Sequence, residues 1–350
     1  MNIVVFKNDA VGDLVHSLDA INNITSNDEN KKITIFLSNF SRRFSFLIQS
    51  PKVEFRVLNY RLKIIERIKL IFFLKKNNIK KVYILSPKNF YYFLPLIFRK
   101  IKFYAICVNS VDNYKRPSLF LRKFLYKYEI NHRENIFKRE STKLIQKRLT
   151  SDDDIKFNFN IRISRSKILN DYLPKKYIYF HHKKKLFNEL KWNFEDLQIL
   201  FSEFSKYCEN IVLTKDIDGW RGDKKSENRN DYFKKTFNTY DFRTNTFSKN
   251  KSNILFLDNI KGEDLFNVIK SSTKVVAFHG MMTNLAYLLN KPVLDLFHCK
   301  INNWDDYRSY RNSFYEFKPQ SINYDFTIPK KNMEKTLKKI RFSLIKCLKK

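Results

Sequence analysis

The residues best placed for chemistry in this chain are two aspartates and a histidine that follow its first apolar segment. Residues Ile3–Phe6 predict a buried strand, and the next turn holds Asp9 and Asp13. A helical pattern follows, and Asp13 and His16 fall on one flank of it, about 60° apart and away from its apolar side. The first turn of a helix favours an ionised carboxylate, and a positioned carboxylate can act as a general base. The alternative is that either aspartate only caps the helix.

This sequence of strand, glycine turn and helix is typical of the first unit of a doubly wound sheet. Gly12 lies in the turn, and Leu14, Leu18 and Ile21 form the apolar side of the expected helix. In a parallel sheet such a turn lies at the carboxyl edge of the strands, where ligands bind. We therefore expect the turn to line a binding site.

A second segment, between residues 275 and 297, has the same plan. Its buried strand ends at Phe278, and another strand begins after Pro292. The turn and helix start between them consist of His279, Gly280, Met281, Met282, Thr283 and Asn284. Backbone N–H groups at a helix start favour a phosphate, and a glycine lets the ligand approach the backbone closely. The alternative is an ordinary connection in which the glycine only turns the chain.

The first segment resembles the heptosyltransferases of lipopolysaccharide core synthesis, glycosyltransferase family 9. The family pattern Lys-x4-Gly-Asp-x2-His-x-Leu falls on Lys7, Gly12, Asp13, His16 and Leu18. The resemblance implies that Asp13 is the catalytic base, that Gly12 contacts the donor, and that Lys7 and His16 lie on the acceptor side. Asp19 departs from the pattern, because the family usually has proline there.

The second segment resembles the donor site of the same family, Asp-Thr-Gly-x-x-His-Leu-x-Ala-Ala followed by proline. Aligned back from Pro292, the family residues Asp, Thr and His fall on His279, Gly280 and Asn284. The segment also resembles the His-Gly-x-x-x-Thr-Asn turn of family 61 glycosyltransferases. Both families place this turn against the phosphates of the donor. The resemblance therefore implies a nucleotide-sugar substrate and no separate cofactor, while the donor's identity stays open.

A third resemblance lies in the same half of the chain. Lys191-Trp192 is similar to the Lys-x-Trp-Pro that opens a helix in the family, and His181 stands where the family has His-Pro at a strand end. The resemblance implies that Lys191 and His181 contact the donor. The alternatives are that Trp192 packs in the core and that the adjacent histidines are solvated. Consecutive strand residues point to opposite faces, so His181 and His182 are poorly placed to bind one metal ion. Lys183, Lys184, Lys185 and Lys191 are candidate partners for phosphate, and the sequence does not distinguish among them.

The composition points to an anionic partner. The chain has 350 residues, of which 43% are hydrophobic, and 68 basic against 35 acidic residues give a net charge of +33. Nucleic acid, an anionic membrane or phosphorylated substrates would each suit such a charge. Cations alternate with large apolar residues in the segments Arg61–Lys76, Phe98–Tyr104 and Arg116–Tyr128. These segments could bind anionic lipid, or they could be core-packing helices with solvated basic faces.

Targeting and metal signals are weak throughout the sequence. The four cysteines are scattered without a CxxC pair, which predicts reduced thiols. The N-terminus does not have the pattern of a signal peptide, and the apolar run Phe90–Phe98 is about half the length of a membrane span. No Asp-x-Asp motif stands at an expected strand end. We expect a cytoplasmic protein, peripheral on the inner face of the cytoplasmic membrane at most, with metal-independent chemistry.

Strands and helices are expected to alternate along both halves of the chain. In the first half the expected strands are Ile3–Phe6, Ile33–Leu37, Val53–Leu58, Lys81–Leu85 and Phe103–Val108, and the expected helices are 13–24, 42–49, 61–77 and a long stretch, Ser118–Leu149. In the second half the strands are Tyr177–Phe180, Asn210–Leu213, Ile254–Leu257, Lys274–Phe278 and Val293–Phe297, with helices at 195–207, 264–271 and 283–290. Residues Lys215–Asn253 lack a sustained period and are expected to be irregular.

Together these features predict an α/β protein of the GT-B type, two Rossmann-like doubly wound domains facing a central cleft. We expect an acceptor-side domain over residues 1–165, a nucleotide-sugar domain over 166–330 and a basic helix over 331–350. The predicted activity is inverting glycosyl transfer to a glycan or lipid-linked acceptor. Two alternatives stay open: a nucleic-acid-binding protein that uses the charge, although no recognition motif supports it, and a degenerate transferase that only binds carbohydrate.

Overall fold

Two compact units make up the computed structural model of this protein. The structure describes residues 2–26, 32–48, 50, 52–109, 115–135, 138, 140–150, 171–189, 192–216, 227–260, 262–278 and 280–296. The described residues up to 150 belong to the first unit, and those from 171 onward belong to the second. The predicted boundary between residues 165 and 166 and the predicted helix 331–350 both lie outside the described residues.

The first unit is built on a seven-stranded sheet. Its strands are β1 (Asn2–Lys7), β2 (Lys32–Leu37), β3 (Val53–Val57), β4 (Ile79–Ile84), β5 (Lys102–Asn109), β6 (Lys115–Arg116) and β7 (Lys127–His132). The order is β3-β2-β1-β4-β5, and β5 also pairs with β7 in parallel and with β6 antiparallel. The winding reverses at β1, as in a doubly wound sheet. The central strands β1 and β2 are almost wholly buried, which explains why they are continuous apolar runs.

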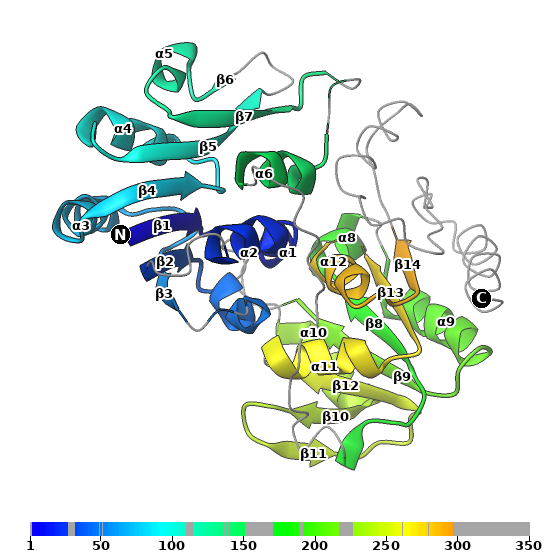
Figure 1. The fold of residues 1–350 in the computed structure, drawn as a ribbon. Helices are drawn as coiled ribbons and strands as arrows, with labels where there is room; N and C mark the ends of the chain where they lie inside the picture. The colour runs from blue at the N-terminus through cyan, green and yellow to red at the C-terminus, as the bar shows by residue number, and fades with distance from the viewer. Residues whose placement is uncertain are drawn as a thin grey trace. The chain divides into compact units, whose positions relative to one another are not determined.

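Helices cover both faces of this sheet (Figure 1). On one face α6 (Thr142–Thr150) packs on α2 (Leu18–Ser26). The other face carries α3 (Ile64–Lys76), the 3-10 helix η2 (Asn89–Phe93), α4 (Leu94–Ile97) and α5 (Leu119–Arg122). Side chains from these four helices pack on one shared apolar cluster with β1, β4 and β5. Two further short helices, α1 (Val11–Val15) and η1 (Ser41–Leu47), follow β1 and β2.

The second unit repeats the plan. Its strands are β8 (Ile178–His182), β9 (Ile211–Lys215), β10 (Asn238–Asp241), β11 (Thr246–Ser248), β12 (Ile254–Asp258), β13 (Lys274–Phe278) and β14 (Val293–Leu296). They follow the order β11-β10-β12-β9-β8-β13-β14, and all pairs are parallel except β10 with β11. The helices are α8 (Lys184–Glu189), α9 (Phe194–Ser205), α10 (Glu227–Thr236), α11 (Gly262–Ser271) and α12 (Met281–Leu288). Here the order reverses at β8, the first strand of the unit.

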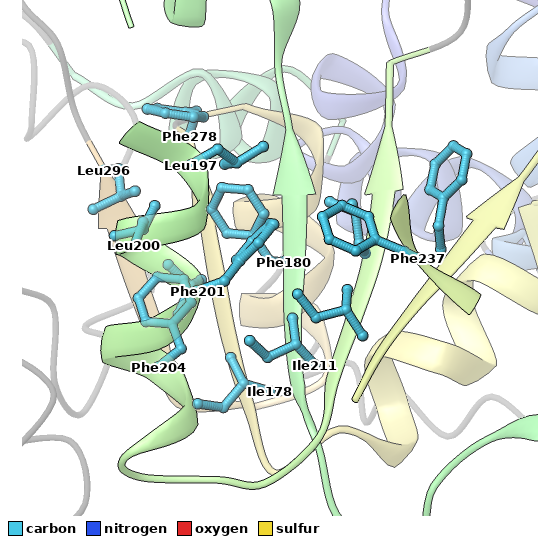
Figure 2. Close-up of a cluster of buried hydrophobic side chains, with 14 of the residues drawn as sticks. Ile178, Phe180, Leu197, Leu200, Phe201, Phe204, Ile211, Phe237, Phe278 and Leu296 are labelled. Atoms are coloured by element: carbon cyan, nitrogen blue, oxygen red, sulfur yellow. The ribbon is translucent and has the colours of Figure 1, made fainter. Parts of the chain in front are cut away.

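An aromatic core holds α9 against this sheet (Figure 2). Phe180 of β8 meets Phe201 of α9 edge to face, with ring centroids 5.4 Å apart. Trp192 is buried against Phe278, at 5.8 Å between ring centroids. The core interpretation of Trp192 is therefore confirmed. A capping box fixes the start of α9, because the Asn193 amide oxygen accepts a hydrogen bond from the Asp196 backbone N–H at 2.9 Å.

Two expectations about secondary structure, one in each unit, are wrong. The stretch 118–149 is not one helix, because β7 interrupts it and pairs in parallel with β5. Pairing with β5, which is distant in the sequence, outweighs the helical pattern of this segment. The stretch 215–253 is not wholly irregular, because it holds α10 and the hairpin β10–β11. Buried Phe233 and Phe237 anchor α10 to the core of the second unit.

The helix expected over residues 13–24 is also interrupted. It divides into α1, which ends at Val15, and α2, which begins at Leu18. The Ser17 hydroxyl donates to the backbone carbonyl of Asp13 at 2.8 Å, and such local bonds compete with regular helix. Cys107 and Cys208 are free thiols, as their isolated positions predict. Among the described helices, none combines the length and the apolar character of a membrane span.

Candidate functional site

Each unit gathers polar side chains where its strand order reverses. Ligands of doubly wound sheets bind beyond the carboxyl ends of the strands at this switch point. In the first unit the switch point is the end of β1, between β2 and β4. In the second it is the end of β8, between β9 and β13. The first selected segment therefore ends its strand at a switch point, and the second lies beside one, since β13 neighbours β8.

A buried ion pair lies at the end of β1. The Lys7 side chain is 1% exposed, and its Nζ is 2.9 Å from Oδ2 of Asp9. Burial raises the pKa of Asp9, the nearby Asp13 carboxylate raises it further, and Lys7 opposes both effects. The Asp13 carboxylate is thus close enough to act on Asp9. Carboxylates whose environments differ in this way can divide acid and base roles between them.

Asp13 lies in the first turn of α1 and is half-buried. The residue that caps α1 is Ala10, and no side chain makes a capping hydrogen bond there. The alternative that Asp9 or Asp13 only caps the helix is therefore wrong. His16 ends α1 and is 6% exposed. Gly12 also lies in α1, and its carbonyl accepts the backbone N–H of His16 at 3.3 Å.

The departure from the family pattern at Asp19 has a structural explanation. Asp19 lies in the first turn of α2, and its Oδ2 is 3.0 Å from Nζ of Lys143 in α6. A carboxylate there joins the two helices that cover one face of the sheet. A proline could not form this ion pair.

Three residues that the sequence analysis did not select complete the end of β1. The Tyr91 hydroxyl donates to the side-chain oxygen of Asn8 at 2.7 Å, and Lys88 Nζ donates to the Asn8 carbonyl at 2.8 Å. Burial lowers the pKa of Lys88 to about 8, an effect that Asp9 opposes and Lys7 strengthens. Lys88 follows β4 after only three residues. Its position beyond a parallel strand was the available signal, since such ends meet at one edge of a sheet.

In the second unit, Lys183 meets the glycine turn. Gly280 precedes α12 with a φ of 155°, a backbone conformation that favours glycine. A Cβ built on Gly280 would lie 3.1 Å from Nζ of Lys183. The ammonium of the residue after β8 thus lies directly at the start of α12. A cation and a helix N-terminus at one point form a site suited to phosphate.

The other residues predicted for the donor site fall around this turn. His181 Nδ1 is 2.9 Å from the Thr214 hydroxyl, so a neighbouring strand orients its ring. Met281 is half-buried, whereas the Met282 and Thr283 side chains are buried. Any contact of these two residues with a ligand would therefore come from their backbone. His279 and Lys191, also predicted to contact the donor, lie outside the described residues.

Asn284 offers a buried acceptor near the start of α12. Its side chain is 6% exposed, and its Oδ1 atom has no hydrogen-bond partner among the described residues. Its backbone N–H donates to the Gly280 carbonyl at 3.2 Å and closes the first turn of the helix. A buried amide oxygen of this kind is suited to accept a hydrogen bond from a ligand.

The paired histidines do not share a site. His182 is fully buried and packs on Phe187 and Phe233, with ring centroids 4.8 and 5.3 Å away. It belongs to the apolar core, whereas His181 meets Thr214. Within the described part of the chain, no three histidine, cysteine, aspartate or glutamate side chains gather as a metal site requires.

Comparison with solved structures shows that this protein has a known fold. An Escherichia coli heptosyltransferase, WaaC, with ADP superimposes with a TM-score of 0.60, 12% identity and all of both chains covered. A glycosyltransferase of family 9 from Veillonella parvula gives 0.61 and 11% identity, over 96% of this chain and 89% of its own. The chain has the GT-B fold of these proteins. No protein-family model matches it, and no curated protein matches it in sequence.

The GT-B fold also occurs in a second group of similar structures. The UDP-GlcNAc 2-epimerase of Neisseria meningitidis, bound to UDP-GlcNAc, gives a TM-score of 0.52 and 9% identity over 100% of this chain and 94% of its own. The predicted fold class is therefore confirmed, and the similar structures include heptosyltransferases, as the motifs predict. At these sequence identities the comparisons establish the fold alone. The activity must therefore be inferred from the residues at the two switch points.

Proposed function

We propose that this GT-B protein is a glycosyltransferase that moves a sugar from a nucleotide-sugar to a glycan or lipid-linked acceptor of surface polysaccharide synthesis. The observation that carries the proposal is the approach of Lys183 to Gly280 at the switch point of the second unit. Support also comes from the fold, which is shared over the full chain with heptosyltransferases.

The second unit would bind the phosphates of the donor. The Lys183 ammonium and the first backbone N–H groups of α12 would neutralise the diphosphate, both in the bound donor and as it leaves. Gly280 leaves room for this approach, because a side chain there would meet Lys183 at 3.1 Å. Since a protein cation supplies the charge, the proposed reaction is independent of a metal ion.

The first unit would supply the base. A hydroxyl of the acceptor attacks the anomeric carbon while Asp13 accepts its proton, and the bond from that carbon to the phosphate oxygen breaks. The nucleoside diphosphate leaves with the bonding electrons, and attack opposite the leaving group inverts the anomeric centre. The Lys7–Asp9 pair beside Asp13 would maintain the electrostatic environment of this base.

The test is nucleotide binding by the chain with Lys183→Gln. Wild-type protein should bind a nucleoside diphosphate, seen as a rise in melting temperature across a panel of bases, and should retain this binding in EDTA. Lys183→Gln should weaken it by about 10-fold or more, the effect of losing a hydrogen bond to a charged group. The unphosphorylated nucleoside should bind both proteins equally.

Lys176→Gln is the matched control, because Lys176 is exposed and precedes β8. It should leave diphosphate binding unchanged. Binding that Lys183→Gln does not weaken, or that EDTA abolishes, would contradict the proposed donor site. Diphosphate binding without transfer to any acceptor would favour the degenerate carbohydrate-binding relative, and preferential binding of duplex DNA would favour the nucleic-acid alternative.

A further inference from the structure

The outer side of α3 is apolar where a surface helix is normally polar. Ile64, Ile65, Ile68 and Phe72 are 49–72% exposed. At 3.6 residues per turn these four side chains lie within about 100° of arc. Leu70 and Leu74, on roughly the opposite side, are buried in the core of the first unit. The helix therefore presents one apolar side to the protein and another to solvent.

Other helices on the same side of the sheet also expose large apolar side chains. Phe93 of η2, Ile97 of α4, and Leu119 and Phe120 of α5 are 50–62% exposed. Figure 1 shows α3, α4 and α5 on one side of the sheet of the first unit. Eight of the sixteen exposed large apolar side chains of the described residues lie on α3, η2, α4 and α5. Scattered single residues need no explanation, but such a concentration marks an interaction surface.

The same face is strongly cationic. The exposed cations on or directly after its helices include Lys69, Lys75 and Lys76 of α3, Arg99 and Lys100 after α4, and Lys123 after α5. Glu66 is the one acidic residue of α3, η2, α4 and α5. On α3, Lys69 and Lys76 border one edge of the apolar stripe, and Arg67 borders the other with its guanidinium 5.5 Å from the Phe90 ring centroid. Glu66 points away from the stripe, because its carboxylate accepts the backbone N–H groups of Asn59 and Lys63.

We infer that this face, the α3–α5 surface, docks on an anionic lipid bilayer. Isoleucine and phenylalanine side chains would enter the boundary between headgroups and acyl chains, while the bordering lysines reach the phosphates. A second copy of the chain fits less well, since two such cationic faces would repel each other. A nucleic acid would satisfy the cations but would leave the isoleucine stripe in water. The inference does not rest on the proposed glycosyl transfer.

The experiment is co-sedimentation of the full chain with lipid vesicles. Vesicles of phosphatidylcholine with phosphatidylglycerol should bind the protein, and vesicles of phosphatidylcholine alone should not. Lys69→Gln, Lys75→Gln and Lys76→Gln combined should weaken binding by about 5-fold per lysine. Ile68→Gln with Phe72→Gln should weaken it at least 10-fold without changing the net charge.

Two control variants distinguish an effect of the α3–α5 surface from an effect of total charge or total exposed apolar area. Lys175→Gln, Lys176→Gln and Lys251→Gln remove the same charge from exposed positions of the second unit. Leu144→Gln with Ile199→Gln removes exposed apolar side chains elsewhere. Both controls should bind anionic vesicles like the wild type.

Four results would overturn the inference. The first is equal binding to neutral and anionic vesicles, and the second is an equal loss of binding in the surface and control variants. The third is a dimer that the Ile68/Phe72 variant abolishes while vesicle binding persists. The fourth is displacement of the protein from vesicles by duplex DNA that binds the same surface. None of these measurements requires a sugar donor. A failed transfer assay therefore leaves the lipid result interpretable, and the reverse also holds.

Discussion

At the scale of single residues, the end of β1 places two carboxylates in different environments. Asp9 is paired with the buried ammonium of Lys7 at 2.9 Å, and burial raises its pKa. Asp13 lies half-buried in the first turn of α1, with no capping role. Of the two, only Asp9 is paired with Lys7, and Asp13 forms no ion pair with the described residues, so Asp13 is the better candidate to receive a proton from an acceptor.

We predict that Asp13→Asn lowers turnover by about 10²- to 10⁴-fold, because an amide cannot accept the proton of the acceptor hydroxyl. Diphosphate binding and melting temperature should change little, since the donor site lies in the second unit. Asp19→Asn is the control on the adjacent helix and should retain wild-type turnover. Release of nucleoside diphosphate from the donor measures both. An Asp13→Asn protein with wild-type turnover would remove Asp13 from the mechanism.

At the scale of elements, an ion-pair cluster explains why residues 227–248 form regular structure. Lys234 of α10 contacts Asp241 at the end of β10 at 2.8 Å and Asp258 at the end of β12 at 3.1 Å. Asp258 is 1% exposed, and Lys215 lies 3.9 Å away on its other side. One lysine thus connects a helix to two strands. The local pattern of this polar segment predicted an irregular stretch, because the partner at residue 258 lies outside it.

We predict that Lys234→Met lowers the free energy of unfolding by about 1–3 kcal/mol, because it leaves the buried Asp258 carboxylate with a weaker partner. Lys235→Met, at the exposed neighbouring position, should change it by less. Urea unfolding measures both variants. Equal stability of the two would contradict the assigned role of Lys234.

The stabilisation by the Lys234–Asp241 ion pair should depend on pH. Burial raises the pKa of Asp241, but hydrogen bonds from Lys234, Arg243 and Asn259 more than offset this, so its pKa lies below 3.8. Its contribution to stability is therefore present above pH 3.8 and is lost as the pH falls through the folded-state pKa. The difference between wild type and Lys234→Met should shrink over this acidic range.

At the scale of the whole molecule, the net charge of +33 opposes folding through self-repulsion. We predict that the melting temperature rises when ionic strength increases from about 0.01 M to 0.15 M, since the screening length falls from about 30 Å to about 8 Å. Sodium acetate should act like sodium chloride, because the effect is screening and not binding of a particular anion. A melting temperature that is constant or falls with salt would contradict the prediction.

The sequence by itself determined most of the elements and both switch-point turns. Apolar runs such as Ile3–Phe6 and Lys274–Phe278 are encoded by adjacent residues, so their periodicity predicts β1 and β13 directly. The glycine turns that follow them are local as well. The doubly wound fold then follows from the alternation of such segments.

Only the tertiary structure decided which distant residues meet. Lys183 and Gly280 are 97 positions apart, and the Lys183 ammonium lies at the Gly280 turn because β8 and β13 are neighbours in the sheet. Lys88 reaches Asn8 for the same reason, since β4 lies beside β1. Strand β7 and helix α10 were missed because long-range pairing and buried ion pairs outweighed their local patterns. Strand order depends on contacts between distant parts of the chain, so a short stretch of sequence does not predict it.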